Sequence, residues 1–314
     1  MVGGCVTVAA PNQFDSVKSA RASWVVVAPG FLHNPEVRQW LNGVEPAWTM
    51  LDFDCFNALR GEPSASNQTI RLEPTLTMTE LSGSAITRNA LIVLRRAVET
   101  NGLKLTAIGN LSRAVVDEMC EIFEWPDYAK DEFFQFHKVI NEPDFLPLHF
   151  VHVLVKATKL VRTHRGKLVP TRLGKGIVVK GQYGALQALL FHVALWHVNL
   201  GYFDRRPLDF WPQSDVGIVL WSLSASANDW LDRETLTRLC TVPVIGILES
   251  TWDLGSSAME ARILRPLMWF GLLEYRSEGI STSGLVERHL YRKTPLFDRF
   301  LQFDVQIETP DTQH

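Results

Sequence analysis

Apolar residues recur at three- and four-residue steps between Ser84 and Thr100, the most regular pattern in this 314-residue chain. Such spacing puts the apolar side chains on one face and predicts an amphipathic helix. Asn101 and Gly102 follow, and glycine tolerates the left-handed backbone that ends many helices. A helix is therefore expected over 84–100, with an apolar face made by Ile86, Ala90, Val93, Leu94 and Ala97.

Three shorter elements are expected after this helix. Residues 103–106 are β-prone, and Ser112 is a suitable N-cap for the helical pattern that follows it. A third helix begins near Pro143, and Pro147 is compatible with it only if it lies in the first turn. The expected order so far is helix, short strand, helix, helix.

A hairpin is expected next. Two β-prone runs, 160–163 and 167–169, flank His164-Arg165-Gly166, a three-residue connection whose glycine can supply a positive φ. Helix, short strand, helix, helix and hairpin is the order of a winged helix, a variant of the DNA-binding helix-turn-helix. We therefore predict a winged helix over 82–176.

A looser version of this order recurs toward the C-terminus. Helical patterns are found at 214–225, 232–240 and 256–270, and strand-like arms at 272–276 and 289–293. The recurrence predicts a second winged helix over 214–303. An ordinary hairpin with a long connection is the alternative interpretation of the two arms.

The predicted fold class is a helix-rich α+β protein that begins with a small α/β segment. In that segment Trp24–Val27 is a strand candidate and Pro35–Leu41 a helix candidate, whereas the stretch from Gly61 to Pro74 is polar and turn-rich. The expected divisions are an N-terminal segment at 1–60, a linker at 61–81, a winged-helix domain at 82–180, a connecting buried helix at 181–212, a second winged-helix-like domain at 213–303 and a disordered tail at 304–314.

Composition favours a cytoplasmic protein without a membrane partner. Hydrophobic residues make up 46% of the chain, and the first residues lack the features of an export signal. Residues 181–203 contain no charged side chain, but four polar groups there, Gln187, His192, His197 and Asn199, favour a buried helix over a bilayer span. The four cysteines are far apart and are expected to be free thiols.

Charge is distributed unevenly along the chain. The formal net charge is −3, but residues 145–203 contain eight Lys or Arg residues and no Asp or Glu, which leaves 23 basic and 34 acidic residues elsewhere. The cations are concentrated on the predicted third helix and hairpin, the two elements with which a winged helix meets a DNA duplex. Neutralising phosphates with such cations provides affinity that does not depend on sequence.

Double-stranded DNA is thus the first predicted partner. The proposed binding residues are His149, His152, Lys156, Lys159, Arg162, His164, Arg165, Lys167, Arg172 and Lys175. His149, His152 and Lys156 share a helix face and suit phosphate or water-mediated contacts better than bidentate recognition of bases. Strong sequence specificity is not expected.

A protein-interaction scaffold is the alternative function. Nine carboxylates between Asp117 and Asp144, against two lysines, could pair with the basic hairpin within the chain, across a homodimer or in another protein partner. A hydrolase that uses the N-terminal segment is a weaker third hypothesis, since the chain has no GxSxG, GxGxxG or P-loop motif. No enzyme activity, catalytic residue, cofactor or small-molecule ligand is predicted. No metal is predicted either, because the histidine pairs lack an HExxH or CxxC context.

The segment from Asn199 to Arg206 gathers several polar groups at the end of the uncharged helix. A catalytic arrangement of Tyr202, Asp204 and an arginine is the alternative interpretation of this segment. A helix end at Gly201, with Asp204 paired to Arg205 or Arg206, is the favoured interpretation.

Two stretches carry a family resemblance. LysLeuThrAlaIleGlyAsnLeu at 104–111 and the stretch from Lys159 to Gly174 resemble an uncharacterised bacterial family of proteins that are often plasmid-borne or linked to mobile elements. The similarity covers roughly residues 100–205 and extends to AsnLeuGlyTyrPheAsp at 199–204. Its motifs are structural turns and strands, and no activity transfers from it. The resemblance implies a bacterial protein of the cytoplasm with an accessory role, as a regulator or factor in plasmid, phage or defence biology.

Overall fold

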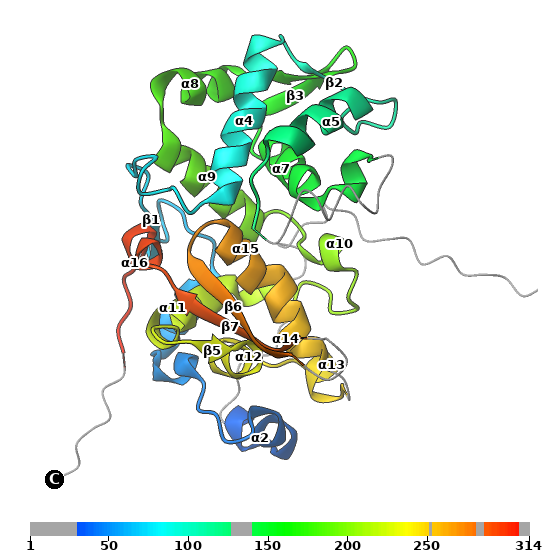
Figure 1. Ribbon diagram of the computed structural model, residues 1–314. Coiled ribbons are helices and arrows are strands. Elements are labelled where there is room, and N and C mark those ends of the chain that lie inside the picture. Colours follow the sequence, from blue (N-terminus) through cyan, green and yellow to red (C-terminus); the bar gives the residue numbers. More distant parts are fainter. Residues whose placement is uncertain (1–29, 127–139, 251–252, 281–285, 308–314) are drawn as a thin grey trace, which may run out of the picture.

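The computed structural model describes residues 30–126, 140–250, 253–280 and 286–307. Two groups of helices, each with a small three-stranded sheet, lie at opposite ends of the molecule (Figure 1). The mixed, helix-rich α+β class that the sequence predicts is confirmed. The strand candidate Trp24–Val27 lies outside the described residues.

The first group follows the predicted order of elements. Helix α4 (Ala85–Glu99) begins where the Ser84 side chain accepts a hydrogen bond from the Thr87 backbone. Strand β2, helices α5 and α7, and strands β3 and β4 come next, at Leu103–Lys104, Arg113–Ile122, Leu146–Ala157, Val161–His164 and Lys167–Pro170. Pro147 does lie in the first turn of α7, where its missing N–H has no helical partner to lose. The antiparallel sheet has the order β2-β4-β3.

The hairpin is tighter than expected. His164 pairs directly with Lys167, so the connection has two residues rather than three. Arg165 and Gly166 both have positive φ, at 47° and 70°. Two successive left-handed residues form the kind of turn whose twist matches that of antiparallel strands.

The second group repeats this order. Helix α11 (Val216–Ser226), strand β5 (Leu231–Asp232) and helix α12 (Arg233–Cys240) are followed, after short α13 (Ile245–Leu248), by a long helix and a hairpin. The long helix consists of α14 (Leu254–Met259), a π-helical stretch at Glu260–Leu264 and α15 (Arg265–Trp269). Strands β6 (Leu273–Ile280) and β7 (Val286–Lys293) form the hairpin, and the sheet order β5-β7-β6 matches that of the first sheet. Strand β5 was not predicted.

The two hairpins end in the same hydrogen bonds. In the first, the Thr171 backbone N–H and hydroxyl both donate to the Leu160 carbonyl. In the second, the Thr294 backbone N–H and hydroxyl both donate to the Leu272 carbonyl. Each threonine is also the N-cap of the next helix, α8 (Arg172–Lys180) or α16 (Pro295–Phe300). The internal repeat therefore extends beyond the order of elements to individual contacts.

The segments predicted as a linker and as a C-terminal tail are partly folded against the rest of the protein. The predicted linker contains β1 (Ile70–Leu72), which pairs with β8 (Leu301–Phe303) near the other end of the chain. Its Leu76 and Leu81 are buried, so this stretch is part of the folded body and not a free connection. Within the predicted tail, Ile307 forms a bridge with Leu51, and residues 308–314 lie outside the description.

The N-terminal helices lie against the second group. Helix α2 (Pro35–Leu41) was predicted, and α3 (Phe53–Arg60) and the short 3-10 helices at Phe31–His33 and Ala47–Met50 were not. The Trp48 indole donates to the Thr241 carbonyl at 3.1 Å, after α12.

A single large hydrophobic cluster runs through both groups, from Ala47 to Leu301. Helix α9 (Tyr183–Trp196) carries buried side chains all around and is the connecting helix that the sequence predicts. Phe150 of α7 packs against Trp269 of α15 with ring centroids 5.2 Å apart, so the two groups share a core. In the described part of the chain no helix is long and apolar enough to cross a bilayer. Cys55, Cys120 and Cys240 are free thiols, as predicted.

Candidate nucleic-acid interface

The outer face of the first sheet carries cations from all three strands. Lys104 of β2 is the register partner of Lys167 of β4, and Lys167 is in turn the partner of His164 of β3. All three side chains are exposed. Like charges placed directly opposite each other destabilise a sheet, so the pairing of Lys104 with Lys167 has an energetic cost that the fold itself does not require.

Further cations surround these three side chains. Arg162 lies two residues before His164, on the same face of β3, and Arg165 occupies the hairpin turn. The others lie just before β3 and on α8. All are exposed: Lys159, Arg162, Arg165, Arg172, Lys175 and Lys180. We call this set, together with Lys104, His164 and Lys167, the basic face. It lies at the end of the molecule away from α2 and α12 (Figure 1).

The basic face differs from its counterpart in the second group. There Arg276 pairs with Glu278 at 2.7 Å, Arg288 with Asp232 at 3.2 Å and Arg292 with Glu274 at 2.8 Å. Among the residues that the structure describes, no ion pair involves a cation of the basic face. The first sheet therefore presents its positive charge to solvent, whereas the second neutralises it.

His149 and His152 do not belong to this surface, contrary to prediction. Both turn inward, where their Nδ1 atoms lie 2.9 Å and 2.7 Å from one carboxylate oxygen of Glu142. Only 5% of His152 is exposed. Helical spacing had put them on one face with Lys156, but that face is covered by the segment that precedes the helix.

Burial disfavours the charged form of Glu142, yet hydrogen bonds outweigh it. The two histidines and the Leu111 backbone N–H all bond to the Glu142 carboxylate. Together they lower the pKa of Glu142 to about 2. The Glu142 carboxylate therefore links α7 to the turn before α5, and its role is structural.

Helix α7 as a whole is unavailable to a DNA groove, which corrects a second expectation. Eight of its twelve residues are buried, and Phe150 is wedged between Phe203 and Trp269. Lys156 is half-buried near the C-terminal end. Buried side chains extend around most of the helix, because the second group packs against the side that a solitary winged helix would expose.

The acidic segment does not neutralise the basic face through its described helix. Glu118 of α5 lies 2.6 Å from Arg96 of α4, and Asp117 lies 3.9 Å from Arg113 of its own helix. Glu124 pairs with Arg88. Glu118 and Glu124 pair with α4 and Asp117 pairs within α5, so these carboxylates do not support docking onto the basic hairpin within the described part of the chain.

Lys104 and Lys180 complete the basic face but were not among the predicted binding residues. Lys180 was counted in the charge of its region and lies at the end of α8. The role of Lys104 depends on the pairing of β2 with β4, which sequence alone does not specify. The sequence signal for Lys104 was its position in a predicted strand of the same domain as the cationic hairpin.

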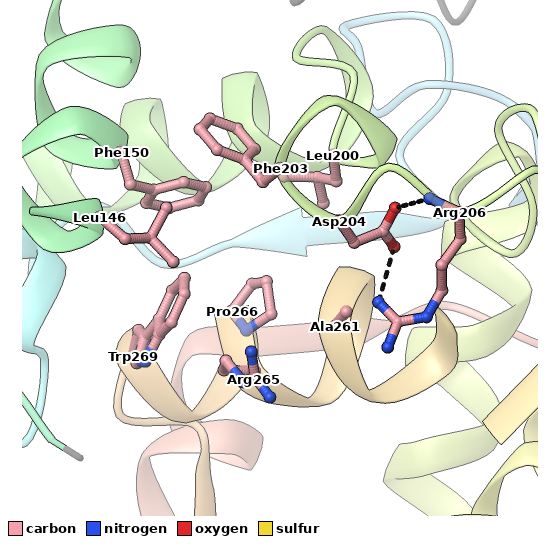
Figure 2. A pocket seen from close by; sticks show the side chains of 10 residues that line it. All are labelled: Leu146, Phe150, Leu200, Phe203, Asp204, Arg206, Ala261, Arg265, Pro266 and Trp269. Atoms are coloured by element: carbon pink, nitrogen blue, oxygen red, sulfur yellow. Dashed lines mark hydrogen bonds and ion pairs between the residues drawn. The ribbon is translucent and has the colours of Figure 1, made fainter. Parts of the chain in front are cut away.

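A cavity of about 240 Å³ lies where the two groups meet. Figure 2 shows Phe150, Phe203 and Trp269 on one side and Asp204 with Arg206 on the other. Asp204 also bonds to the fully buried Arg262, at 2.8 Å. Arg262 in turn donates to the Leu208, Asp209 and Trp211 carbonyls. Asp204 also pairs with Arg206 at 3.6 Å, as the favoured interpretation predicts. The helix end predicted at Gly201 is wrong, because α9 ends at Trp196 and Gly201 begins the short helix α10 (Gly201–Asp204).

Fold and surface together define a class: a helix-rich α+β protein with two similar helix-and-sheet groups, of which one presents an unneutralised cationic face. The Y4jL N-terminal domain family matches residues 82–183, which span the first group and α8. The uncharacterised protein y4jL of Sinorhizobium fredii (strain NBRC 101917 / NGR234) is 31% identical over 165 residues, or 47% of this chain and 74% of that protein. The chain belongs to this uncharacterised bacterial family, as the resemblance indicated. No solved structure matches it.

Proposed function

We propose that this protein binds double-stranded DNA through the basic face, and that its two helix-and-sheet groups are winged helices. The order helix, strand, helix, helix, strand, strand supports the second part, as does the sheet order in both groups. Under this proposal the hairpin β3-β4 is a wing. The protein acts as a regulator or accessory factor of a bacterial mobile-element or defence system, a role that rests on family resemblance.

One observation carries the proposal: exposed basic side chains lie on all three strands of the first sheet, and no ion pair in the described part of the chain involves them. Phosphates spaced along a duplex would relieve the mutual repulsion of Lys104 and Lys167. The turn residue Arg165 and the start of α8 extend this set in two directions. An extended cationic strip suits a polyanion better than a single small anion.

The burial of α7 determines how DNA would be contacted. Because α7 lies inside the core, it is not available to enter the major groove as the recognition helix of a typical winged helix does. Contacts then fall on the phosphate backbone, which positions a protein without identifying bases. Low sequence specificity and a strong dependence on salt follow.

Fluorescence anisotropy with a mixed-sequence duplex at several salt concentrations tests this function. Five or six phosphate contacts give a slope of about −5 in a plot of log K against log salt. The double variant Arg165→Glu/Lys167→Glu should reduce affinity at least tenfold at low salt, because both cations become repulsive.

A matched control comes from the second hairpin. Arg276→Glu/Arg288→Glu makes the same change in net charge on exposed strand residues of the other sheet. This variant should keep most of the affinity, since those arginines already have carboxylate partners. No binding by the unaltered protein at low salt, or equal losses in both double variants, contradicts the proposal.

A protein partner is the second candidate, favoured by one feature of α8. Leu173 and Val179 are 52% and 81% exposed on the same helix as Arg172 and Lys175. Exposed apolar groups among cations suit an acidic protein surface or a second copy of the chain. Light scattering after size exclusion tests the second copy: a dimer that Leu173→Glu/Val179→Glu converts to a monomer supports it, and a monomer at all concentrations rules it out.

A further inference from the structure

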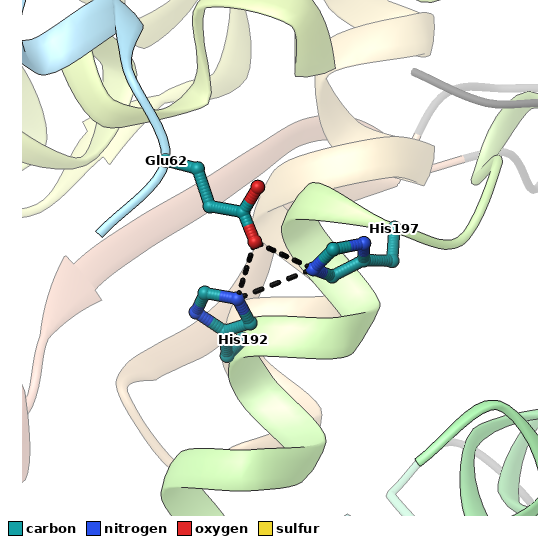
Figure 3. A group of neighbouring side chains, drawn as sticks. All are labelled: Glu62, His192 and His197. Atoms are coloured by element: carbon teal, nitrogen blue, oxygen red, sulfur yellow. Dashed lines mark hydrogen bonds and ion pairs between the residues drawn. The ribbon is translucent and has the colours of Figure 1, made fainter. Parts of the chain in front are cut away.

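Two histidines and a glutamate converge at one point between α9 and the end of α3. Glu62 Oε1 lies 2.8 Å from His192 Nε2 and 2.7 Å from His197 Nε2, and the two Nε2 atoms are 3.2 Å apart. Figure 3 shows all three side chains turned toward the space between them. In the described part of the chain, these are the His, Cys, Asp or Glu groups close enough for three of them to share one metal ion.

Each donor is held by its own piece of structure. His192 lies on α9 and stacks on Trp196, with ring centroids 5.6 Å apart. His197 is the C-cap of the same helix, and the end of the helical course there lets its ring turn back toward His192. Neither ring depends on the carboxylate alone for its position.

Glu62 reaches the site from a segment that is far away in sequence. It follows α3, whose last residue Arg60 is tied to Asp215 by an ion pair of 3.0 Å. The Asn67 side chain donates to the carbonyls of Ala58 and Glu62 and closes the turn between them. A fixed turn therefore delivers the carboxylate to the two imidazoles.

The donor atoms and their spacing suit a small transition-metal ion. Two imidazole nitrogens and a carboxylate oxygen form a common ligand set for zinc and related divalent ions. In a triangle with sides of 2.7, 2.8 and 3.2 Å, a point about 2.05 Å from every corner lies about 1.2 Å off the plane. Ligand atoms on a tetrahedral zinc ion are about 3.3 Å apart, so the carboxylate needs to move by about 0.5 Å.

Two other histidine–glutamate groups are less suited to binding a metal ion. Glu142 is buried and already receives the Leu111 backbone N–H besides His149 and His152. Glu260 receives Arg233, His289 and Tyr291. Each of those carboxylates has three partners that join parts of the fold. The side chains of Glu62, His192 and His197 are instead 21%, 24% and 37% exposed, which leaves solvent access for a further ligand.

We propose that Glu62, His192 and His197 bind one divalent metal ion of the zinc class. Each imidazole offers its Nε2 lone pair and keeps its proton on Nδ1, the carboxylate offers Oε1, and water occupies the open position. The ion joins the segment after α3 to α9. This site is independent of the basic face.

Isothermal titration of the chelator-treated full chain with Zn²⁺ tests the site, and Co²⁺ reports its geometry by visible absorption. The expected result is one ion per chain with micromolar or tighter affinity, a higher Tm, and the intense bands of four-coordinate cobalt. His192→Gln, His197→Gln and Glu62→Gln should each weaken Zn²⁺ binding at least tenfold. His164→Gln removes an exposed histidine of the hairpin and should leave binding unchanged.

Circular dichroism first establishes that each variant is folded. If a histidine variant does not fold, Glu62→Gln still tests the site, because glutamine keeps the shape of the glutamate side chain. Absence of binding at about 100 µM Zn²⁺ would overturn the proposal. So would one-to-one binding that survives in the folded double variant His192→Gln/His197→Gln.

Discussion

Among single residues, Glu142 shows how a buried carboxylate can hold a fold together. Only 1% of it is exposed, and burying a lone charge is costly. Bonds from His149, His152 and the Leu111 backbone offset that cost and join three separate segments. Removing the charge leaves these donors with a weaker acceptor, so this position controls the stability of the first group.

Replacement of Glu142 by Gln should lower the free energy of unfolding at pH 7 by about 2–3 kcal/mol. The pKa of Glu142 is lowered from 4.5 to about 2, so its contribution is complete above pH 4.5 and is lost as the pH falls toward 2. Urea unfolding of both proteins at several pH values should show the difference between them shrinking over that window.

Glu249→Gln is the control for this experiment, because Glu249 is an exposed residue at the end of a short helix. It should change stability by less than about 0.5 kcal/mol. A Glu142→Gln effect of the same small size, or one that grows with acidity, contradicts the structural role of the carboxylate.

At the scale of elements, the two long helices that precede the hairpins end in the same way. The second residue after each helix is left-handed: Lys159 with φ of 57° and Gly271 with φ of 76°. The next N–H returns to the carbonyl five residues back, from Leu160 to Val155 and from Leu272 to Leu267. This is the Schellman end, which favours glycine because other residues are strained there.

The two ends should respond oppositely to substitution. Lys159→Gly should raise stability by about 0.5–1 kcal/mol by relieving the strain, while it weakens duplex binding because one exposed cation is lost. Thermal unfolding and anisotropy measure the two effects on one variant. A loss of stability would show that the Lys159 side chain has a packing role.

Gly271→Ala should lower stability by at least about 2 kcal/mol. A Cβ atom there would lie 2.8 Å from the Gly83 carbonyl carbon and 2.9 Å from the Ser84 nitrogen, both backbone atoms. Neither can move without disturbing the start of α4. Thermal unfolding alongside Gly166→Ala, which has no atom within 4 Å of the added Cβ, separates the clash from the strain of positive φ.

For the whole molecule, the shared core makes the two groups depend on each other. Trp269 touches Phe150 and Trp125 of the first group, with ring centroids 5.2 Å apart in both pairs. The same arrangement buries α7 and so restricts DNA contact to the basic face. Structure and proposed function are thus linked through one interface.

Unfolding should accordingly occur in a single transition. Tryptophan fluorescence and far-ultraviolet circular dichroism should give coincident urea curves, and Trp269→Ala should shift both by about 3–5 kcal/mol. The ring of Trp230 is half-buried beneath Arg276 and Arg292, so Trp230→Ala should lower the free energy of unfolding much less than Trp269→Ala does. Two separated transitions would show that the groups fold independently.

The amino-acid sequence by itself determined the local features of this protein. Helix starts at Ser84 and Asp232, the hairpin at Gly166 and the concentration of cations over 145–203 depend on neighbours a few residues away, so pattern and capping chemistry identify them. The same reasoning found the α+β class and the repeat.

Tertiary structure alone decided which of these features meet and which remain exposed. It buried His152 against Glu142, paired β1 with β8, placed Lys104 beside Lys167, and brought Glu62 to a histidine 130 residues away. Contacts over such separations depend on the summed packing of many side chains, and no local pattern encodes that sum. For this reason the basic hairpin was predictable, whereas the loss of α7 from the surface and the Glu62 site were not.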